Sequence, residues 1–243
     1  MTAAQTSSKQ APVVFYVVRH GQTLFNVENR VQGWCDSPLT DEGRRVASAL
    51  GAGLANVEFV SAYASDSQRA KDTATLILDA QATARHMQPH QRIACVADSR
   101  LREWCYGDLE GGSGDRLRET LAQGFGEVLP FSELNERLVE VANILACADT
   151  SGRAEGFDVI EQRLRSFFMQ VGSEIQQKGG GNVLAVTHAF IVRTLVYLLD
   201  RARVNTPLKI QNASVTRLVY DQGILHLEDI GSVEWIHQSK TIE

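Results

Sequence analysis

The 243-residue sequence lacks the features that mark membrane, secreted and zinc-binding proteins. No stretch approaches the roughly 20 apolar residues of a membrane span, and the first ten residues have no apolar signal-peptide core. We therefore expect a cytoplasmic protein without a membrane partner. The four cysteines are widely spaced, with no Cys-x-x-Cys pair, which predicts reduced, mostly structural thiols and no zinc site.

Concentrated positive charge is also missing. The chain has 24 Lys and Arg against 29 Asp and Glu, a net charge of -5, and no basic run. This balance argues against nucleic acid or an anionic membrane as a partner. A small anionic substrate stays compatible with it where cations gather locally. Composition leaves the oligomeric state open, a homodimer included.

Strand and helix patterns alternate along the chain. Short apolar runs predict strands at 13–18, 59–64, 93–97 and 183–186, and two more, 215–220 and 224–230, form a predicted edge hairpin. Apolar residues at helical spacing predict helices at 40–56, 68–80, 158–177 and 190–199. The alternation predicts a three-layer α/β/α fold with a mostly parallel sheet and one antiparallel edge strand.

The expected organisation is a disordered tail at 1–11 and a single α/β domain over 12–243. The alternating pattern breaks down at about 108–155, where Gly-rich sequence is followed by short helical pieces such as 132–146. We expect this region to be a small cap insertion over the strand ends.

Two apolar strands deliver a histidine at their carboxyl end, His20 and His188. Such ends of parallel strands meet at one edge of the sheet, where α/β proteins bind ligands, so the two imidazoles are expected to face each other. Arg19 precedes His20, and Arg69 follows a strand at a helix start on the same edge. Two guanidiniums and an imidazole around one point suit a phosphoryl group.

A neutral imidazole in line with phosphorus can attack it. His20 is the better nucleophile because Gly21 beside it permits close approach of the backbone to the substrate. The turn after His188 is expected to point the N–H groups of Ala189 and Phe190 at the anion. One carboxyl can protonate the leaving oxygen and then activate water. The residue types leave four candidates for it: Asp98, Glu103, Asp108 and Glu110.

Five short motifs occur in order along the chain: Arg19-His20-Gly21-Gln22-Thr23 with Asn26; Gln32-Gly33 with Pro38-Leu39-Thr40 and Gly43; Ser65-Asp66 with Arg69-Ala70 and Asp72-Thr73-Ala74; Leu101-Arg102-Glu103; and Thr187-His188. Together they resemble the histidine phosphatase superfamily, in its phosphoglycerate mutase-like branch, branch 1. The resemblance covers residue 13 to about residue 220, with the 108–155 region unmatched.

The resemblance implies a role for each matching residue. His20 would become phosphohistidine, Glu103 would be the acid and base, and the phosphoryl group would be held by Arg19, Arg69 and His188. The substrate-binding residues would be Thr23, Asn26, Gln32, Gly33, Tyr106 and Ala189. Neither a cofactor nor a metal is expected.

The activity expected is hydrolysis of a small phosphorylated metabolite through phosphohistidine. A mutase-type phosphotransferase would need extra cations for a second anionic group, but residues 108–155 hold ten acidic and four basic residues. That excess also disfavours multiply phosphorylated substrates. The adjacent-arginine, Pro-rich stretch of the family's mutases is missing, and Trp104 replaces the arginine usual after the acid. The alternatives are the mutase and a catalytically silent module that binds phosphorylated ligands.

Overall fold

A computed structural model describes residues 10–238, so nearly all of the predicted tail at 1–11 lies outside the described residues. The centre of the fold is a six-stranded sheet in the order β3-β2-β4-β1-β5-β6. Its strands are β1 (Val13–Arg19), β2 (Phe59–Ala64), β3 (Cys95–Ala97), β4 (Gly181–Thr187), β5 (Val215–Asp221) and β6 (Ile224–Ser232).

Strand directions confirm the predicted fold class. The four strands β3, β2, β4 and β1 pair in parallel with their neighbours. The antiparallel edge is the predicted hairpin, in which β5 runs antiparallel to β1 and β6 turns back along β5. Parallel strands all end at the same edge of the sheet, which therefore gathers the polar residues that follow them.

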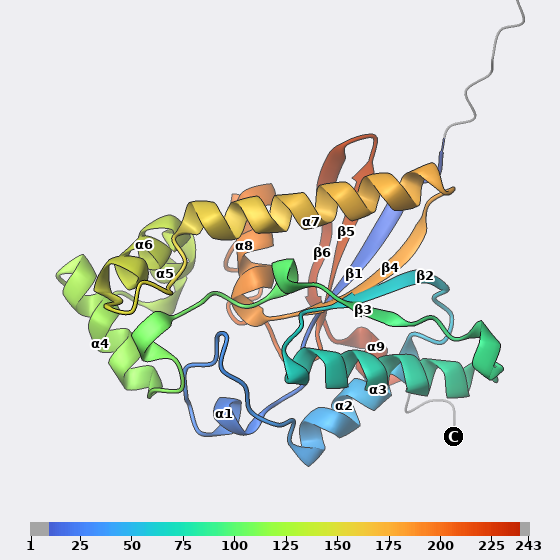
Figure 1. Cartoon of the computed structure of the whole chain (residues 1–243), viewed down its shortest axis with the longest axis horizontal. Helices are drawn as coiled ribbons and strands as arrows, with labels where there is room; N and C mark the ends of the chain where they lie inside the picture. The colour runs from blue at the N-terminus through green and yellow to red at the C-terminus, as the bar shows by residue number, and fades with distance from the viewer. Residues whose placement is uncertain (1–9, 239–243) are drawn as a thin grey trace, which may run out of the picture.

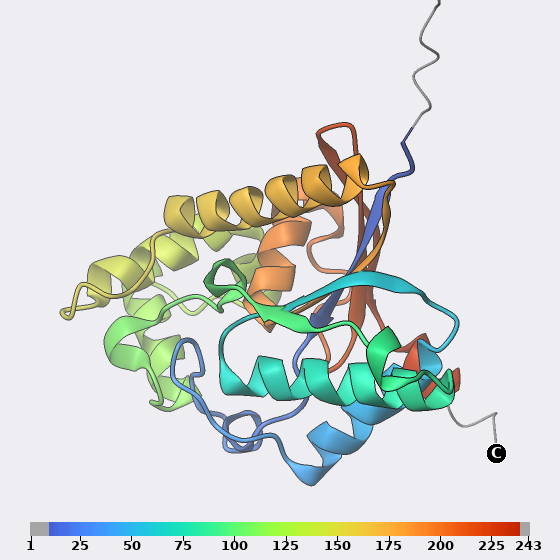
Figure 2. The same cartoon turned by 45° about the vertical axis from the view of Figure 1, so that its right-hand side comes forward.

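Helices cover both faces of the sheet (Figures 1 and 2). On one face lie α2 (Asp41–Gly53), α3 (Gln68–Ala84) and α9 (Glu234–Gln238), and on the other α7 (Phe157–Gln177) and α8 (Ala189–Leu199). β1 supplies both cores: Phe15 and Val17 pack on the α7 side, whereas Tyr16 and Val18 pack on the α2 side. Because side chains alternate between faces, a strand buried on both faces is apolar throughout.

One predicted helix is too short because a polar residue of it faces inward. Helix α3 continues to Ala84, four residues beyond the prediction. Gln81 on it is buried and donates to the carbonyl oxygens of Leu54 and Val57, both at 2.9 Å. An inward glutamine interrupts an apolar pattern without ending the helix, so the pattern predicted too short a helix.

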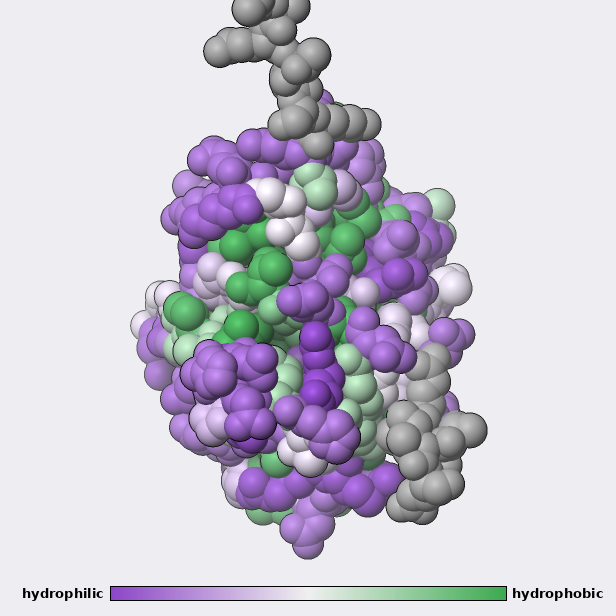
Figure 3. Space-filling view, turned by 90° about the vertical axis from the view of Figure 1, so that its right-hand side faces the viewer, coloured by the Kyte–Doolittle hydropathy of each residue, from purple (hydrophilic) through white to green (hydrophobic). Residues whose placement is uncertain are grey.

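The remaining helices lie between these elements. They are α1 (Leu24–Val27), α4 (Gly114–Phe125), α5 (Phe131–Glu136), α6 (Leu138–Ala148) and the short 3-10 turns η1 (Pro89–Gln91), η2 (Ser99–Leu101), η3 (Gly107–Leu109) and η4 (Arg201–Arg203). Helices α4 to α6 gather at one end of the molecule (Figure 1). The opposite end is mostly hydrophilic around smaller apolar areas (Figure 3). In the described residues no helix has the length and apolar character to cross a membrane.

Candidate active site

Strand register brings the two predicted histidines together. β1 and β4 pair in parallel, and the last pair of their register is Arg19 with Thr187. His20 and His188 are the next residue on each chain segment, and their ring centroids lie 5.2 Å apart. Both side chains are buried. The expected meeting of two imidazoles at the sheet edge is a direct consequence of this pairing.

Hydrogen bonds assign opposite tautomers to the two rings. His20 Nδ1 lies 2.7 Å from the carbonyl oxygen of Gly21, which can only accept, so Nδ1 carries the proton and Nε2 keeps a lone pair. His188 Nδ1 lies 3.0 Å from Nη2 of Arg69, which can only donate, so this Nδ1 accepts and Nε2 carries the proton. One ring therefore offers a nucleophilic nitrogen and the other an N–H.

Burial keeps both imidazoles neutral. The pKa of His20 lies well below 6.5 because its ring is desolvated and because the Arg69 and Arg19 guanidiniums are near. Desolvation and then Arg69 lower the pKa of His188 in the same way. Burial lowers the pKa of Arg19 to about 10, so this guanidinium stays charged at neutral pH. The site thus combines neutral rings with fixed positive charge.

The first turn of α3 places Arg69 beneath the two histidines. Its guanidinium is fully buried and donates from Nη1 to the carbonyl of Cys35 at 2.9 Å and to Asp36 at 3.0 Å. Nη2 donates to the carbonyl of Gly33 at 2.7 Å as well as to His188. The loop 33–36 therefore fixes Arg69, and Arg69 fixes the tautomer of His188.

Gly21 makes a close approach to a neighbouring helix, a reason for glycine at this position besides the expected approach to the substrate. A Cβ at Gly21 would lie 2.7 Å from the carbonyl oxygen of Gly43 in α2. The Gly21 N–H donates to the Thr73 hydroxyl of α3 at 3.0 Å. The glycine lets the turn after His20 sit tightly against α2 and α3, because any side chain there would clash with backbone.

Three buried N–H groups beside His20 have no hydrogen-bond partner within residues 10–238. They are Nε of Arg19, Nε of Arg69 and Nε2 of His188, and one further unpaired group, Nε of Arg217, belongs to the hairpin. An unpaired buried donor costs about 1–3 kcal/mol, so proteins keep few of them. Unpaired donors from two arginines and a histidine around one neutral ring indicate a place for an anion.

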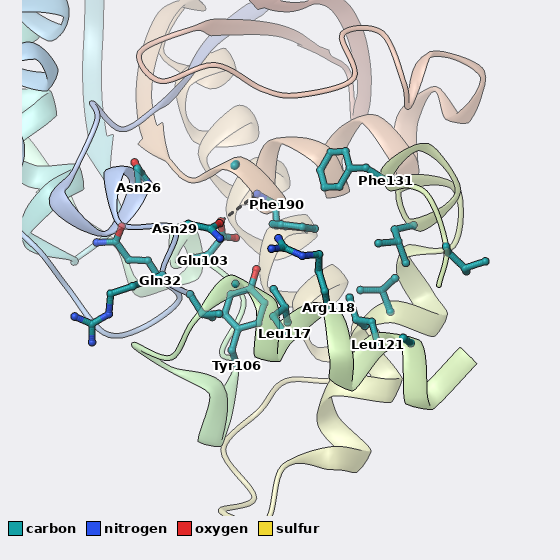
Figure 4. A pocket seen from close by; sticks show the side chains of 18 of the residues that line it. Asn26, Asn29, Gln32, Glu103, Tyr106, Leu117, Arg118, Leu121, Phe131 and Phe190 are labelled. Atoms are coloured by element: carbon teal, nitrogen blue, oxygen red, sulfur yellow. Dashed lines mark hydrogen bonds between the residues drawn. The ribbon is translucent and has the colours of Figure 1, made fainter. Parts of the chain in front are cut away.

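Of the four candidate carboxyls, only Glu103 lines the pocket of His20. Its carboxylate accepts the N–H groups of Trp104 at 3.0 Å and Phe190 at 3.1 Å (Figure 4). Burial raises its pKa above 4.5, although these N–H groups and nearby arginines act in the opposite direction. A buried carboxyl with a raised pKa can hold a proton for a leaving group.

At the start of α8, the Phe190 N–H binds the Glu103 carboxylate and not the substrate anion that was expected. The sequence predicts that the N–H groups of Ala189 and Phe190 point at the substrate, but the Phe190 N–H donates to Glu103. The prediction was wrong for Phe190 because the helix start binds a carboxylate of the chain itself. Ala189 lines the pocket as expected.

The other three carboxyls hold the backbone or a neighbouring side chain. Asp98 accepts the N–H of Arg100 and forms an ion pair with its guanidinium. Asp108 accepts the N–H of Thr150 at 2.8 Å. Glu110 accepts four backbone N–H groups at 2.8 to 3.1 Å, those of Gly33, Trp34, Cys35 and Tyr106.

Glu110 is the least foreseeable residue near the site. Its carboxylate clamps the loop at Gly33 and Cys35, and the carbonyls of those two residues hold Arg69. Sequence reasoning offered it only as a candidate acid. Its four partners are backbone groups of any residue type, so no side-chain motif could have revealed the clamp.

Arg163 on α7 is a second residue that sequence reasoning missed. It donates to the carbonyls of Arg100, Arg102 and Glu103 at 2.6 to 3.0 Å and pairs with Glu155 at 2.9 Å. It therefore fixes the loop that carries Glu103. Nothing in the amphipathic pattern of α7 distinguishes it from a solvated arginine.

The six predicted substrate-binding residues fall into two groups. Asn26, Gln32, Tyr106 and Ala189 line the pocket. Thr23 and Gly33 are not among its lining residues. Thr23 caps α1 and donates to Gln32 at 2.7 Å, while Gly33 gives its carbonyl to Arg69. Thr23 therefore orients Gln32, which lines the pocket, and Gly33 helps to orient Arg69.

The pocket has a volume of about 320 Å³ and extends from His20 to helices α4, α5 and α6. Arg19, His20 and Glu103 line it, whereas Arg69 and His188 lie buried beyond its lining; we call these five the histidine cluster. The opposite side is an apolar wall, defined as Leu117, Leu121, Phe125, Phe131 and Leu134 (Figure 4). Sequence reasoning did not foresee this wall.

The four cysteines form no disulfide bonds and are free thiols, as predicted. Over residues 10–238, no group of three His, Cys, Asp or Glu side chains is arranged to hold a metal ion.

Fold and site together define the class of protein: an α/β protein with paired histidines and arginines at the carboxyl ends of adjacent parallel strands. The profile of the histidine phosphatase superfamily (branch 1) matches residues 15–232, and the chain belongs to that superfamily. Members act on phosphate esters as phosphatases or mutases, so this chain is assigned to enzymes of that chemistry.

Individual relatives include both activities. The chain is 34% identical over 184 residues to 2,3-bisphosphoglycerate-dependent phosphoglycerate mutase 2 of Gloeobacter violaceus, covering 76% of this chain and 74% of that protein. It is 41% identical over 115 residues to the fructose-2,6-bisphosphatase TIGAR of Mus musculus, covering 47% of this chain and 40% of that protein. The crystal structure of phosphoglycerate mutase from Bacillus anthracis superposes with a TM-score of 0.86 at 34% identity, covering 96% of this chain and 98% of that one.

Proposed function

We propose that this chain is a phosphomonoester hydrolase that acts on a small phosphorylated metabolite through a phosphohistidine at His20. The observation that carries the proposal is the set of three unpaired buried N–H groups beside a neutral imidazole. Arg19, Arg69 and His188 offer these donors, and Nε2 of His20 keeps the lone pair that attacks phosphorus.

Two steps complete the reaction. In the first, His20 Nε2 forms a bond to phosphorus while the ester P–O bond breaks, and protonated Glu103 gives its proton to the leaving oxygen. In the second, water attacks phosphorus, Glu103 takes the proton of the water, and the P–N bond breaks to release inorganic phosphate. Glu103 ends protonated, and His20 returns to its starting state.

A mutase is the second candidate, and the identity to phosphoglycerate mutases favours it. In a mutase the phosphoryl group moves from the histidine to an oxygen of a molecule that carries a second anionic group, which calls for cations away from His20. Two arginines besides Arg19 line the pocket, and each is engaged: Arg30 binds the carbonyl of Gly111, and Arg118 pairs with Asp115. This arrangement supports water as the acceptor.

A silent phospho-ligand module is the third candidate. A binding module has no use for a buried carboxyl with a raised pKa beside its anion site, and Glu103 is such a carboxyl. The position of Glu103 therefore supports an enzyme. Ligand binding without turnover, from pH 5 to 8, would favour the silent module.

Release of inorganic phosphate separates these functions. With 3-phosphoglycerate and 2,3-bisphosphoglycerate present together, we expect phosphate release and little 2-phosphoglycerate; rapid isomerisation would contradict the hydrolase. His20→Ala should abolish release. His226→Ala is the matched control, because His226 is an exposed histidine of β6, and it should retain full activity. Cytoplasmic location and oligomeric state stay predictions.

A further inference from the structure

The negative charge of the 108–155 region is not found on the pocket lining, although Arg118 of that region is. None of its ten acidic residues is among the pocket-lining residues. Several are occupied elsewhere: Glu110 binds loop N–H groups, Glu140 pairs with Arg137, and Glu155 pairs with Arg163. The expected repulsion of multiply phosphorylated substrates therefore has no source on the pocket lining.

Besides Arg118, the region presents mainly the apolar wall to a ligand. Leu117, Leu121 and Phe125 recur every four residues on α4, so they share one face of the helix. Phe131 and Leu134 of α5 complete the wall, and the figure shows Phe131 and Phe190 on the side facing Leu117 and Leu121 (Figure 4). The polar side chains of Asn26, Asn29 and Gln32 lie on the other side of the pocket from Leu121 and Phe131 (Figure 4).

A leaving group bound to phosphorus at His20 can extend into the rest of this pocket, which His20 and Glu103 both line. Hydroxyl groups held against the wall would lose water without gaining hydrogen bonds, which is unfavourable. A second phosphate would compete with Glu28 for Arg30 and with Asp115 for Arg118, each held in an exposed ion pair. Apolar carbon atoms would instead be removed from water against five apolar side chains.

We propose that the substrates are phosphomonoesters of apolar alcohols, alkyl or aryl, and that the apolar wall selects them. The assignment rests on the proposed hydrolase function and names its substrate class. Transfer itself occurs at the histidine cluster. The wall contributes by binding the carbon skeleton that departs.

An alkyl series isolates this contribution. Ethyl, butyl and hexyl phosphate have leaving alcohols of similar basicity, so their P–O cleavage is chemically alike. We expect kcat/KM to rise roughly fourfold for each methylene that becomes buried. Glycerol 3-phosphate and glucose 6-phosphate, which carry hydroxyls instead, should fall below butyl phosphate.

Leu117→Gln tests the wall directly, because a glutamine at this half-buried position is of similar size and polar. The ratio of kcat/KM for hexyl to ethyl phosphate should fall at least tenfold. Val139→Gln is the matched control, since Val139 is 38% exposed and does not line the pocket. Its ratio should equal that of the wild type, and its circular dichroism and that of Leu117→Gln should be native.

Equal kcat/KM across the series, or preference for the sugar phosphates, would overturn the substrate class if His20 is still phosphorylated by ethyl phosphate. The hydrolase would then stand. An unchanged hexyl-to-ethyl ratio in Leu117→Gln would overturn selection by the wall. Failure of every ester to phosphorylate His20 would overturn the proposed function and the substrate class with it.

Discussion

The histidine cluster and the apolar wall face each other across one pocket but are built in different ways. Cluster members lie at or near strand or helix ends, and hydrogen bonds fix them: His20 bonds to the backbone of Gly21, and His188 to the side chain of Arg69. The wall comes from α4 and α5, which contribute side chains with no polar partner to define them. The cluster is therefore suited to one reaction, whereas the wall sets which alcohol can leave.

The largest effect short of losing the nucleophile is expected at Glu103. Glu103→Gln keeps the shape but cannot donate its proton, so kcat/KM for butyl phosphate should fall about 10³-fold. A para-nitrophenyl ester, whose alcohol leaves without a proton, should still phosphorylate the protein. Phosphoenzyme should then accumulate because water lacks its base, as rapid-quench measurements would detect. Equal losses for both esters would contradict the assignment.

His188→Ala removes one of the three unpaired donors and the acceptor of Arg69. Loss of one donor to the developing charge is expected to reduce kcat about 10²-fold. Steady-state kinetics with an alkyl and an aryl ester should show the same loss for both, because the leaving group is not involved. A loss that differed between the two esters would contradict this role, because it would mean that His188, like the wall, acts on the leaving alcohol.

The pH dependence of kcat/KM should reflect the ionisation of His20 and of Glu103. His20 must be neutral, and because its pKa is well below 6.5, its protonation limits the rate only in acid. Glu103 must be protonated in the first step, and its raised pKa extends that form to higher pH. For alkyl esters kcat/KM should fall up to tenfold per pH unit on the alkaline side. Persistence of that alkaline limb in Glu103→Gln would contradict its assignment to this carboxyl.

Glu110→Gln should have the smallest effect, since Glu110 touches the cluster only through the loop at 33–35. One amide cannot accept four N–H groups as a carboxylate does, and the loss of about 1 kcal/mol corresponds to roughly fivefold weaker function. Vanadate, a phosphate analogue, should inhibit less well while the hexyl-to-ethyl ratio stays unchanged. Glu140→Gln, at an exposed carboxylate of α6, is the control. Unaltered vanadate inhibition would contradict the role of Glu110 in holding the loop that positions Arg69.

The arginines and histidines of the cluster could be placed at one edge of the sheet from the sequence, because each lies at or shortly after the carboxyl end of a strand. His20 and His188 each follow a buried apolar run. The pairing of Arg19 with Thr187 then places the two histidines next to each other. The use of the Phe190 N–H was not predictable, because it depends on where Glu103 comes to lie. Glu103 itself was identified only through the family resemblance.

The wall could not be predicted for a physical reason. Leu117, Leu121 and Phe125 have the spacing of any core-facing helix. Whether such a face packs against other side chains or leaves a hollow depends on helices 131–136 and 138–148, whose positions the local pattern does not define. Net charge is limited in a similar way, because it counts acids without saying where they point.

Mapping the phosphoryl group after brief exposure to a phosphomonoester tests the central claim most directly. Alkaline quenching, peptide mass spectrometry and phosphorus NMR should find an acid-labile phosphate on Nε2 of His20, and none in His20→Ala. Phosphate on Nδ1, on His188, or at undiminished level in the His20→Ala protein would contradict the account.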